Sequence, residues 1–115
     1  KSYVIEPGEF VLMVSNEILN IPNGIIAFVQ GRSSIARLGI QTEQAGLIDA
    51  GFNGTITFEV FNQSKHNIVL YPRMRIAQVY FFKAQEAQVP YGEKNKYNGQ
   101  LSATGSKINN DPELK

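Results

Sequence analysis

A hydrophobic period near two, repeated in short runs, is the feature that most constrains how this chain can fold. The run 55–62 shows it most clearly, because Ile56, Phe58 and Val60 fall on every second position. Such alternation places apolar side chains on one face of an extended strand. No segment keeps the longer period of a helix, so the sequence predicts an all-β domain. The predicted strands are residues 2–5, 9–15, 25–30, 46–48, 55–62, 68–71 and 76–83.

Turn-forming residues separate these predicted strands. Pro7-Gly8, Pro22-Asn23-Gly24 and Asn53-Gly54 each stand between two apolar runs. Proline fixes one backbone angle, and glycine and asparagine accept the left-handed angles that tight turns need. Strands this short, joined by turns this frequent, predict a distorted β-barrel or jelly roll with a single short helix.

The overall composition limits the classes of protein that remain. The chain has 115 residues, the size of one domain, and its 43% of hydrophobic residues suffice for a modest core. No apolar run approaches the ~18 residues that span a bilayer, so we expect a soluble protein without a membrane partner. A formal net charge of +1 gives no electrostatic case for nucleic acid as a partner. The lack of cysteine is compatible with a cytoplasmic location, and Lys1 in place of an initial Met is expected of a processed chain or a fragment.

The nonapeptide 31–39, GRSSIARLG, carries the clearest signal for binding a ligand. It follows an apolar run and has the features of a very short helix, which either of its serines can cap and its last glycine can end. Backbone N–H groups in the first turn of a helix attract anions. Arg32 and Arg37 add two planar cations that match phosphate oxygens. The alternative interpretation is an ordinary capped turn with two solvated arginines.

Two acidic residues mark a second candidate region, the stretch 45–62. Asp49 lies among glycines that predict a tight hairpin, and Phe52 follows it with no clear reason to be exposed. Glu59 interrupts a strand of bulky apolar residues, where burying a carboxylate is costly. Glu59 therefore either faces water or lies in a pocket that uses it to take and return a proton. The alternative to a functional role for Asp49 is that its side chain caps the turn.

The character of the sequence changes after Gln85. We therefore divide the chain into a β domain of residues 1–85 and a C-terminal arm of residues 86–115. The arm is rich in Ser, Asn and Lys and lacks the apolar content to form core. We expect that it either frays or becomes ordered over another part of the molecule.

Four segments together carry a resemblance to a known family. Residues 31–39, 45–62, 72–78 and 90–100 follow one another in the order and approximate spacing seen in dCTP deaminases of the dUTPase superfamily, which the chain resembles over most of its length. The resemblance implies a dUTPase-like distorted barrel or jelly roll and a homotrimer with active sites at subunit boundaries. It also implies a triphosphate bound with Mg²⁺ and a hydrolytic deamination that needs no zinc.

The residue types agree with that last expectation. Zinc-dependent nucleotide deaminases hold their metal with His and Cys ligands in an H-x-E and P-C-x-x-C pattern. This chain has one His and no Cys. If it deaminates a nucleotide, it does so without that metal centre.

The resemblance also implies roles for the acidic and basic residues singled out above. It makes Glu59 the general base, which activates water for attack on C4 of cytosine and returns the proton as ammonia leaves. Arg32, Ser33 and Arg37 are expected at the phosphates, with Ser33 and Arg37 also close to the reacting base. Asp49 corresponds to a hairpin aspartate that meets the sugar 3′-hydroxyl and, in relatives that hydrolyse dUTP, helps to activate water.

The remaining contacts implied by the resemblance surround the nucleotide. Ile48 and Phe52 belong to the hairpin, and Phe52 is expected beside the deoxyribose. Gln78 resembles a phosphate-side glutamine, and its alternative role is that of a strand amide bonded to backbone. The positions on the arm that are expected to close over the nucleotide and bind phosphates and base are Tyr91, Lys96 and Gln100.

Three functions are consistent with these residues. The first is a dCTP deaminase that releases dUTP and ammonia and can continue to dUMP and diphosphate. The second is a dUTP diphosphatase, in which Asp49 rather than Glu59 orients the attacking water. The third is a non-catalytic nucleotide-binding or regulatory trimer. The joint presence of both arginines, Ser33, Asp49 and Glu59 argues against the third, because a scaffold alone would not need all five.

Overall fold

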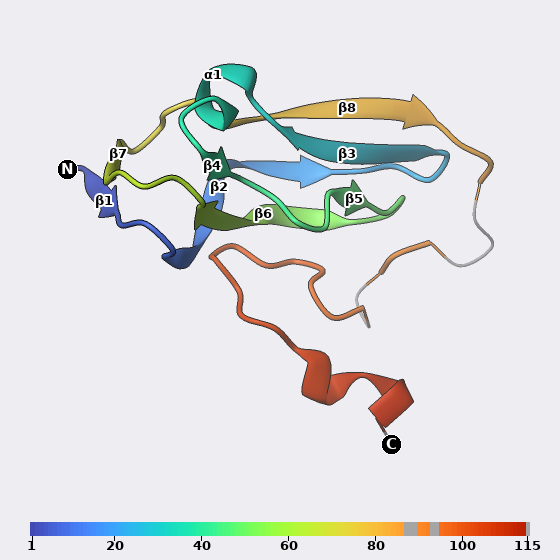
Figure 1. Cartoon of the computed structure of the whole chain (residues 1–115). Helices are drawn as coiled ribbons and strands as arrows, with labels where there is room; N and C mark the ends of the chain where they lie inside the picture. Colours follow the sequence, from blue (N-terminus) through green and yellow to red (C-terminus); the bar gives the residue numbers. More distant parts are fainter. Residues whose placement is uncertain (87–89, 93–94, 115) are drawn as a thin grey trace.

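Three small antiparallel sheets form the computed structural model of the chain, which describes residues 1–86, 90–92 and 95–114. One sheet has the order β2-β6-β4, a second has the order β5-β3-β8, and β1 pairs with β7 in the third. In Figure 1, β3 and β8 of the second sheet lie above β2 and β6 of the first, and β1 and β7 stand at one end of the molecule. The predicted all-β class is confirmed. The strands are β1 (Tyr3–Ile5), β2 (Phe10–Asn20), β3 (Ile25–Gly31), β4 (Ile40–Gln41), β5 (Leu47–Ile48), β6 (Asn53–Asn62), β7 (Ile68–Leu70) and β8 (Ala77–Lys83).

The strand β2 is longer than the sequence pattern predicts, because a bulge interrupts its alternation. Its pairing with β6 passes from Val14 opposite Thr57 directly to Ile18 opposite Thr55. The bulge is stabilised by Ser15, whose hydroxyl donates to a backbone carbonyl of the bulge at 2.7 Å and accepts the N–H of Ile56 at 2.8 Å. A strand interrupted in this way loses the simple period from which its end would be read.

The short helix predicted at residues 32–38 is present as α1 (Ser33–Ala36). The predicted capping by a serine is wrong: the N-cap residue is Arg32, in extended conformation, and no side chain caps the helix. Both serines lie inside the first turn, since the helix already begins at the first of them. Gly39 follows at a φ of 95°, and its N–H donates to the carbonyl of Ala36 at 2.9 Å. The left-handed angle at this glycine ends the helix as expected.

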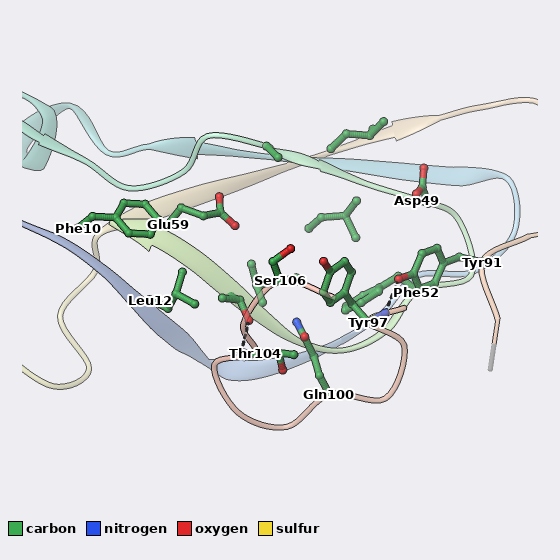
Figure 2. Close-up of a pocket in the computed structure, with 15 residues that line it drawn as sticks. Phe10, Leu12, Asp49, Phe52, Glu59, Tyr91, Tyr97, Gln100, Thr104 and Ser106 are labelled. Atoms are coloured by element: carbon green, nitrogen blue, oxygen red, sulfur yellow. Dashed lines mark hydrogen bonds between the residues drawn. The ribbon is translucent and has the colours of Figure 1, made fainter. Parts of the chain in front are cut away.

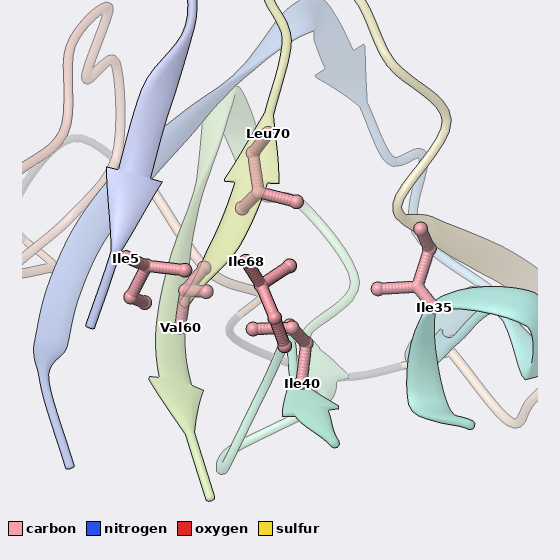
Figure 3. Packing of buried hydrophobic residues seen from close by; sticks show 6 residues of the cluster. All are labelled: Ile5, Ile35, Ile40, Val60, Ile68 and Leu70. Carbon is pink, nitrogen blue, oxygen red and sulfur yellow. The ribbon is translucent and has the colours of Figure 1, made fainter. Parts of the chain in front are cut away.

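Two clusters of buried side chains hold the sheets together. One lies between the layers and contains Ile21, Ala27, Val29, Ile48 and Phe52. The other lies beneath β1, β7 and α1, and Figure 3 shows its members pointing toward one another. These are Ile5, Ile35, Ile40, Val60, Ile68 and Leu70.

Burial of Ile35 gives α1 its fixed position. A helix of four residues is too short to be stable in water on its own. Ile35 is only 2% exposed and packs in the second of these clusters, whereas the rest of α1 is exposed. The apolar contact therefore orients the polar residues of the helix, Ser33 among them, toward the surface.

We call the last part of the C-terminal arm, residues 101–114, the tail and keep the word arm for the residues before it. The tail contains two further short helices of the 3-10 type. They are η1 (Ile108–Asn110) and η2 (Pro112–Leu114), and neither was expected from the sequence. Both are single turns with exposed side chains, so they leave no periodic pattern to read. Among the described residues, no helix has the length and apolarity that crossing a membrane requires.

Asn62 at the end of β6 ties β1 to the turn that follows β6. Its side chain is fully buried, and its amide nitrogen donates to the carbonyls of Ile5 and His66 at 2.9 and 2.8 Å. Its amide oxygen accepts the N–H of Ser64 at 2.9 Å and the hydroxyl of the same residue at 2.7 Å. A buried amide satisfied on both sides is costly to remove, because its partners then lose their hydrogen bonds.

Replacement of Asn62 by alanine should therefore destabilise the fold strongly. We expect Asn62→Ala to lower the free energy of unfolding by about 3 kcal/mol, because two carbonyls and the groups of Ser64 lose their partner. Chemical denaturation measures this change. Gln63→Ala is the matched control, since its side chain is exposed, and an equal loss of stability in both variants would contradict the assigned role of Asn62.

Candidate functional site

A pocket of about 470 Å³ opens between the outer face of the β2-β6 pair, the hairpin before β6 and the C-terminal arm. Its volume falls in the range of small-molecule sites, which bury most of a ligand of nucleoside size or larger. Apolar side chains from β2, β5 and β6 form much of its wall, among them Leu12, Ile48 and Ile56. Figure 2 shows the two carboxylates of the pocket, Glu59 and Asp49, toward its opposite ends.

Glu59 reaches the pocket because it belongs to the outer set of side chains on β6. It stands opposite Leu12 of β2, so an apolar neighbour covers one side of it. The side chain is half-buried, and its Oε1 accepts the N–H of Gln44 at 3.1 Å. Of the two placements that the sequence allowed, a solvated sheet face and a pocket, the structure shows the pocket. The carboxylate is thus held in a defined place beside space that a ligand can occupy.

The predicted hairpin at Asp49 is a tight turn between two sheets, because β5 before it pairs with β3 and β6 after it pairs with β2 and β4. The prediction of paired strands is therefore wrong, and we keep the word hairpin for this turn. It is closed by backbone rather than by the aspartate side chain. The N–H of Phe52 donates to the carbonyl of Asp49 at 3.2 Å, and Gly51 and Phe52 both bond the backbone of Ile21 at 2.8 Å. The exposed carboxylate of Asp49 has no hydrogen-bond partner in the described parts of the chain and lines the pocket instead. Phe52 is buried, as expected, and its ring packs on that of Tyr91 at a centroid distance of 5.5 Å.

The C-terminal arm docks on this hairpin and on the start of β6 through its backbone. The N–H of Tyr91 donates to Ala50 at 2.8 Å, and the N–H of Thr55 donates to the carbonyl of Gln100 at 2.8 Å. The side-chain amide of Gln100 returns a hydrogen bond to the carbonyl of Thr55 at 2.7 Å. Between these two anchors, the N–H of Tyr97 donates to the hydroxyl of Tyr91 at 2.8 Å. The arm therefore forms one wall of the pocket.

Two glycines make this close docking sterically feasible. A Cβ on Gly54 would lie 2.8 Å from the carbonyl oxygen of Gln100, and a Cβ on Gly51 would lie 2.9 Å from the backbone nitrogen of Tyr91. Both distances are shorter than side-chain carbons normally allow. The φ angles of 94° at Gly51 and 149° at Gly54 also favour glycine. The hairpin is thus shaped to receive a backbone at both anchors.

Burial and charge raise the pKa of Tyr91 above its ordinary value. Burial is the larger cause, and the negative charge of Asp49 adds to it, partly offset by the N–H that Tyr97 donates. The phenol consequently stays protonated over the physiological range. A protonated phenol near the hairpin carboxylate can donate a hydrogen bond to a ligand oxygen there.

The pocket also includes tail residues that no pattern in the sequence indicates. Thr104 and Ser106 line it, and the N–H of Thr104 donates to the hydroxyl of Thr57 at 3.1 Å. Tyr97 lines it as well, and its hydroxyl accepts the N–H of Lys107 at 3.2 Å. Ser and Thr in a polar tail have no pattern that separates wall residues from solvated ones. Tyr97 lies within the resembling segment 90–100, which is the one hint that could have indicated it.

Lys96 lies beside this wall in an ion pair. Its ammonium donates to Oδ2 of Asp111 at 2.7 Å, with the two side chains 35% and 20% exposed. The hydrogen bond raises the pKa of Lys96 and lowers the pKa of Asp111, which also accepts the N–H of Glu113. The expected phosphate ligand of the arm is therefore occupied by a carboxylate of the tail.

The residues expected at the phosphates lie elsewhere in this single chain. Neither Ser33 nor Arg37 lines the pocket that contains Glu59, and α1 stands above the sheets, on the side away from the arm (Figure 1). Arg32 bonds the carbonyl of Arg75 at 3.1 Å. The amide of Gln78 donates to the carbonyl of Gly31 at 3.2 Å, which is the alternative role weighed for it.

The structure thus divides the predicted site residues into two groups. The pocket brings together Ile48, Asp49, Phe52, Glu59, Tyr91 and Gln100, with Lys96 next to it. The residues expected to bind the phosphates lie around α1 and the start of β8. They are Arg32, Ser33, Arg37 and Gln78. The first group can hold a sugar and a base between two carboxylates, and the second can hold an anion.

Comparison with known proteins identifies the family. Residues 1–84 match the family model described as dCTP deaminase-like. The chain belongs to the dCTP deaminase-like family. The matched residues include the hairpin, β6 and α1. They therefore contain all the predicted site residues except Tyr91, Lys96 and Gln100 of the arm.

Relatives of this dCTP deaminase-like chain are longer than the sequence itself. It is 43% identical over 109 residues to "dCTP deaminase, dUMP-forming" of Persephonella marina, which covers 94% of the chain and 59% of that protein. A protein of the same name from Hydrogenobaculum sp. is 47% identical over 107 residues, with 92% and 59% covered. The chain therefore spans about three fifths of the length of these relatives.

Solved structures of similar fold are dUTPases. Native EIAV dUTPase superposes with a TM-score of 0.65 at 25% identity, covering 83% of this chain and 78% of that one. The D95N dUTPase from phage phi11 of S. aureus gives a TM-score of 0.66 at 15% identity, covering 84% and 80%. The fold of the dCTP deaminase-like chain is therefore dUTPase-like, as the resemblance implied.

The close contact at Gly54 predicts a specific effect on the arm. Gly54→Ala should displace the arm from β6, because the new Cβ would overlap the backbone of Gln100. We expect trypsin to cleave after Lys96 roughly tenfold faster in this variant than in the parent chain, as local opening becomes easier. Limited proteolysis followed by mass spectrometry measures the rate. Gly105→Ala is the control, since a Cβ there meets no atom within 4 Å, and equal cleavage rates in both variants would argue against the steric role.

Proposed function

We propose that this chain hydrolyses dCTP to dUTP and ammonia and carries the product on to dUMP and diphosphate. The observation that carries the proposal is a half-buried carboxylate, Glu59, held by one backbone N–H in a pocket that ends at a second carboxylate, Asp49. Membership in the dCTP deaminase-like family supports it, as does the name "dCTP deaminase, dUMP-forming" of relatives 42–47% identical.

In the proposed deamination, Glu59 takes a proton from a water molecule as its oxygen attacks C4 of the cytosine. That proton passes to N3 of the ring as the tetrahedral centre forms. Glu59 then takes the proton of the new hydroxyl group and returns it to the amino group, which leaves as ammonia while the C4 carbonyl forms. Water supplies the oxygen and both transferred protons, so no redox partner is needed. The single N–H bond from Gln44 to Oε1 leaves the other carboxylate oxygen for the water.

The second step places Asp49 at the phosphate end of the pocket. Its carboxylate, unpartnered within the described segments, can meet the sugar 3′-hydroxyl and orient a water molecule toward the α-phosphorus of dUTP. Ile48 and Phe52 form the adjoining apolar surface, on which the deoxyribose would lie. Tyr91, Gln100 and Lys96 would close over the nucleotide from the arm. Mg²⁺ would enter as part of the substrate, bound to its phosphate oxygens.

We further propose that the complete site lies between subunits of a homotrimer. The support is the separation of the two groups of residues within one chain: α1, with Ser33 and Arg37, does not reach the pocket with Glu59. The outer surface of β3 and β8 also carries exposed aromatic residues, with Phe28 and Phe82 in edge contact at 5.8 Å. A neighbouring subunit that covers this surface and brings its own α1 to the pocket would satisfy both observations.

Two products distinguish the functions that the sequence left open. The chain is incubated with dCTP or with dUTP in the presence of Mg²⁺, and ammonia and diphosphate are measured separately. The proposal expects both products from dCTP. Ammonia alone would restrict the chain to deamination, diphosphate from dUTP alone would make it a diphosphatase, and binding without either product would make it a non-catalytic nucleotide-binding protein.

Glu59→Gln should abolish release of ammonia. The amide keeps the shape and an acceptor oxygen, but it cannot take a proton from water, so we expect kcat for deamination to fall by about 10³-fold or more. The dissociation constant of dCTP, measured by calorimetry, should change little. Near-normal deamination by this variant would refute the role of Glu59.

Arg37→Ala tests the role of α1 and the assembly together. We expect this variant alone to lose dCTP affinity and turnover in parallel, because a guanidinium on the phosphates serves ground and transition states alike. Co-refolding it with Glu59→Gln should restore activity in about one quarter of the sites, since a site built from two chains can then combine both intact residues. No recovery in the mixed oligomers would show that Glu59 and Arg37 do not come from different subunits.

A further inference from the structure

The ion pair between Lys96 and Asp111 connects the arm to the last turn of the tail. Lys96 directly precedes Tyr97, which lines the pocket, and its ammonium interacts electrostatically with the phenols of Tyr97 and Tyr91. Asp111 precedes η2. This ion pair is the one salt bridge within the described ranges. A cation at the edge of a nucleotide pocket is thus neutralised from within the same chain.

The two carboxylate oxygens of Asp111 have separate partners. Oδ2 accepts the ammonium of Lys96 at 2.7 Å, and Oδ1 accepts the N–H of Glu113 at 3.0 Å. The second bond caps the tail turn, so the carboxylate is positioned by local backbone before it meets Lys96. A second contact holds the same part of the tail, the N–H of Lys107 donating to the hydroxyl of Tyr97 at 3.2 Å.

The carboxylate of Asp111 accepts a hydrogen bond from the Lys96 ammonium, as a phosphate oxygen of a ligand would. Both are anionic oxygens that accept short, charge-assisted bonds from a lysine. A ligand phosphate can form a full ion pair with Lys96 only when the carboxylate of Asp111 moves away from the ammonium. A partly exposed ion pair contributes about 1 kcal/mol or less, so a polyanion can displace it while an uncharged ligand cannot.

We propose that Asp111 is a positioning residue that sets the affinity of the pocket for phosphorylated ligands by holding Lys96 until a phosphate chain displaces it. The proposal rests on the proposed function of the site as a nucleotide pocket. The proposal adds a basis for selectivity. The Lys96–Asp111 ion pair lowers the affinity for every phosphorylated ligand, and a ligand with more negative charge displaces Asp111 more readily. Displacement also removes one of the two contacts that hold this part of the tail, the other being the bond between Lys107 and Tyr97.

The test uses binding rather than turnover, in a Glu59→Gln background that keeps dCTP intact. We expect Asp111→Asn to tighten dCTP binding about threefold to fivefold and to leave deoxycytidine binding unchanged. Asparagine keeps an oxygen that can cap the tail turn, so the variant removes the charge with little change of shape. In a Lys96→Met background the same substitution should have no effect on dCTP, which isolates the pair. Glu113→Gln is the charge-matched control.

A second measurement follows the tail directly. Saturating dCTP should speed hydrogen exchange at the amides of residues 108–114, because Asp111 has lost Lys96. Equal effects of Asp111→Asn on dCTP and deoxycytidine, or unchanged exchange in the tail on dCTP binding, would overturn the proposal while leaving the nucleotide site intact. Failure of dCTP to bind any of the variants or the parent would overturn the proposed function and this inference together.

Discussion

The pairing of β2 with β6 is the constraint on which the rest of the molecule depends. Its inner face supplies Val60 to the buried core, and its outer face presents Glu59 and Leu12 to the pocket. A shift of one residue in this register would exchange the two faces and bury the carboxylate. The fixed ends of the pair, at Asn62 on one side and at the Gly54 contact with the arm on the other, make such a shift costly.

The pocket is a joint product of a rigid part and a loosely held part. The sheet and the hairpin are tied by backbone bonds to Ile21 and by the burial of Phe52. The arm adds Tyr91, Tyr97 and Gln100 through a small number of bonds, and the Oε1 of Gln100 is buried without a hydrogen-bond partner among the described residues. An unsatisfied acceptor weakens the docked arrangement, because its desolvation is not compensated. The arm is thus held less firmly than the sheet and the turn on which it packs.

Periodicity explains which parts of the fold could be predicted from the sequence. The all-β class and most strand positions follow from alternation such as that of residues 55–62, because the buried face and the exposed face differ in polarity there. The two-residue strand β4 and the extension of β2 beyond Ser15 could not be predicted, since one is too short to show a period and the other contains a bulge. The prediction of a serine N-cap was wrong, because the burial of Ile35 in the core determines where this one-turn helix begins.

Less of the candidate site than of the fold could be predicted from the sequence. Glu59 and Asp49 were found because a charge in an apolar strand and an acid in a glycine turn are locally unusual. Their placement in one pocket depends on tertiary pairing and could not be read from spacing alone. Thr104 and Ser106 were missed, since their role follows from a tail that packs on β6 through single hydrogen bonds. Local sequence therefore indicates the two carboxylates, whereas their placement in one pocket and the walls that the arm and tail contribute depend on tertiary packing.

The bulge in β2 has a consequence for how this architecture tolerates change. Between the pairs at Val14 and Ile18, β2 carries two more residues than β6 does. An even number of extra residues preserves the parity of the strand, so Val14 and Ile18 point to the same side. Insertions or deletions of residue pairs at this point would leave both core and ligand surface in phase, while a single-residue change would invert everything downstream to Asn20. The bulge therefore makes this part of β2 a place where length can vary in steps of two.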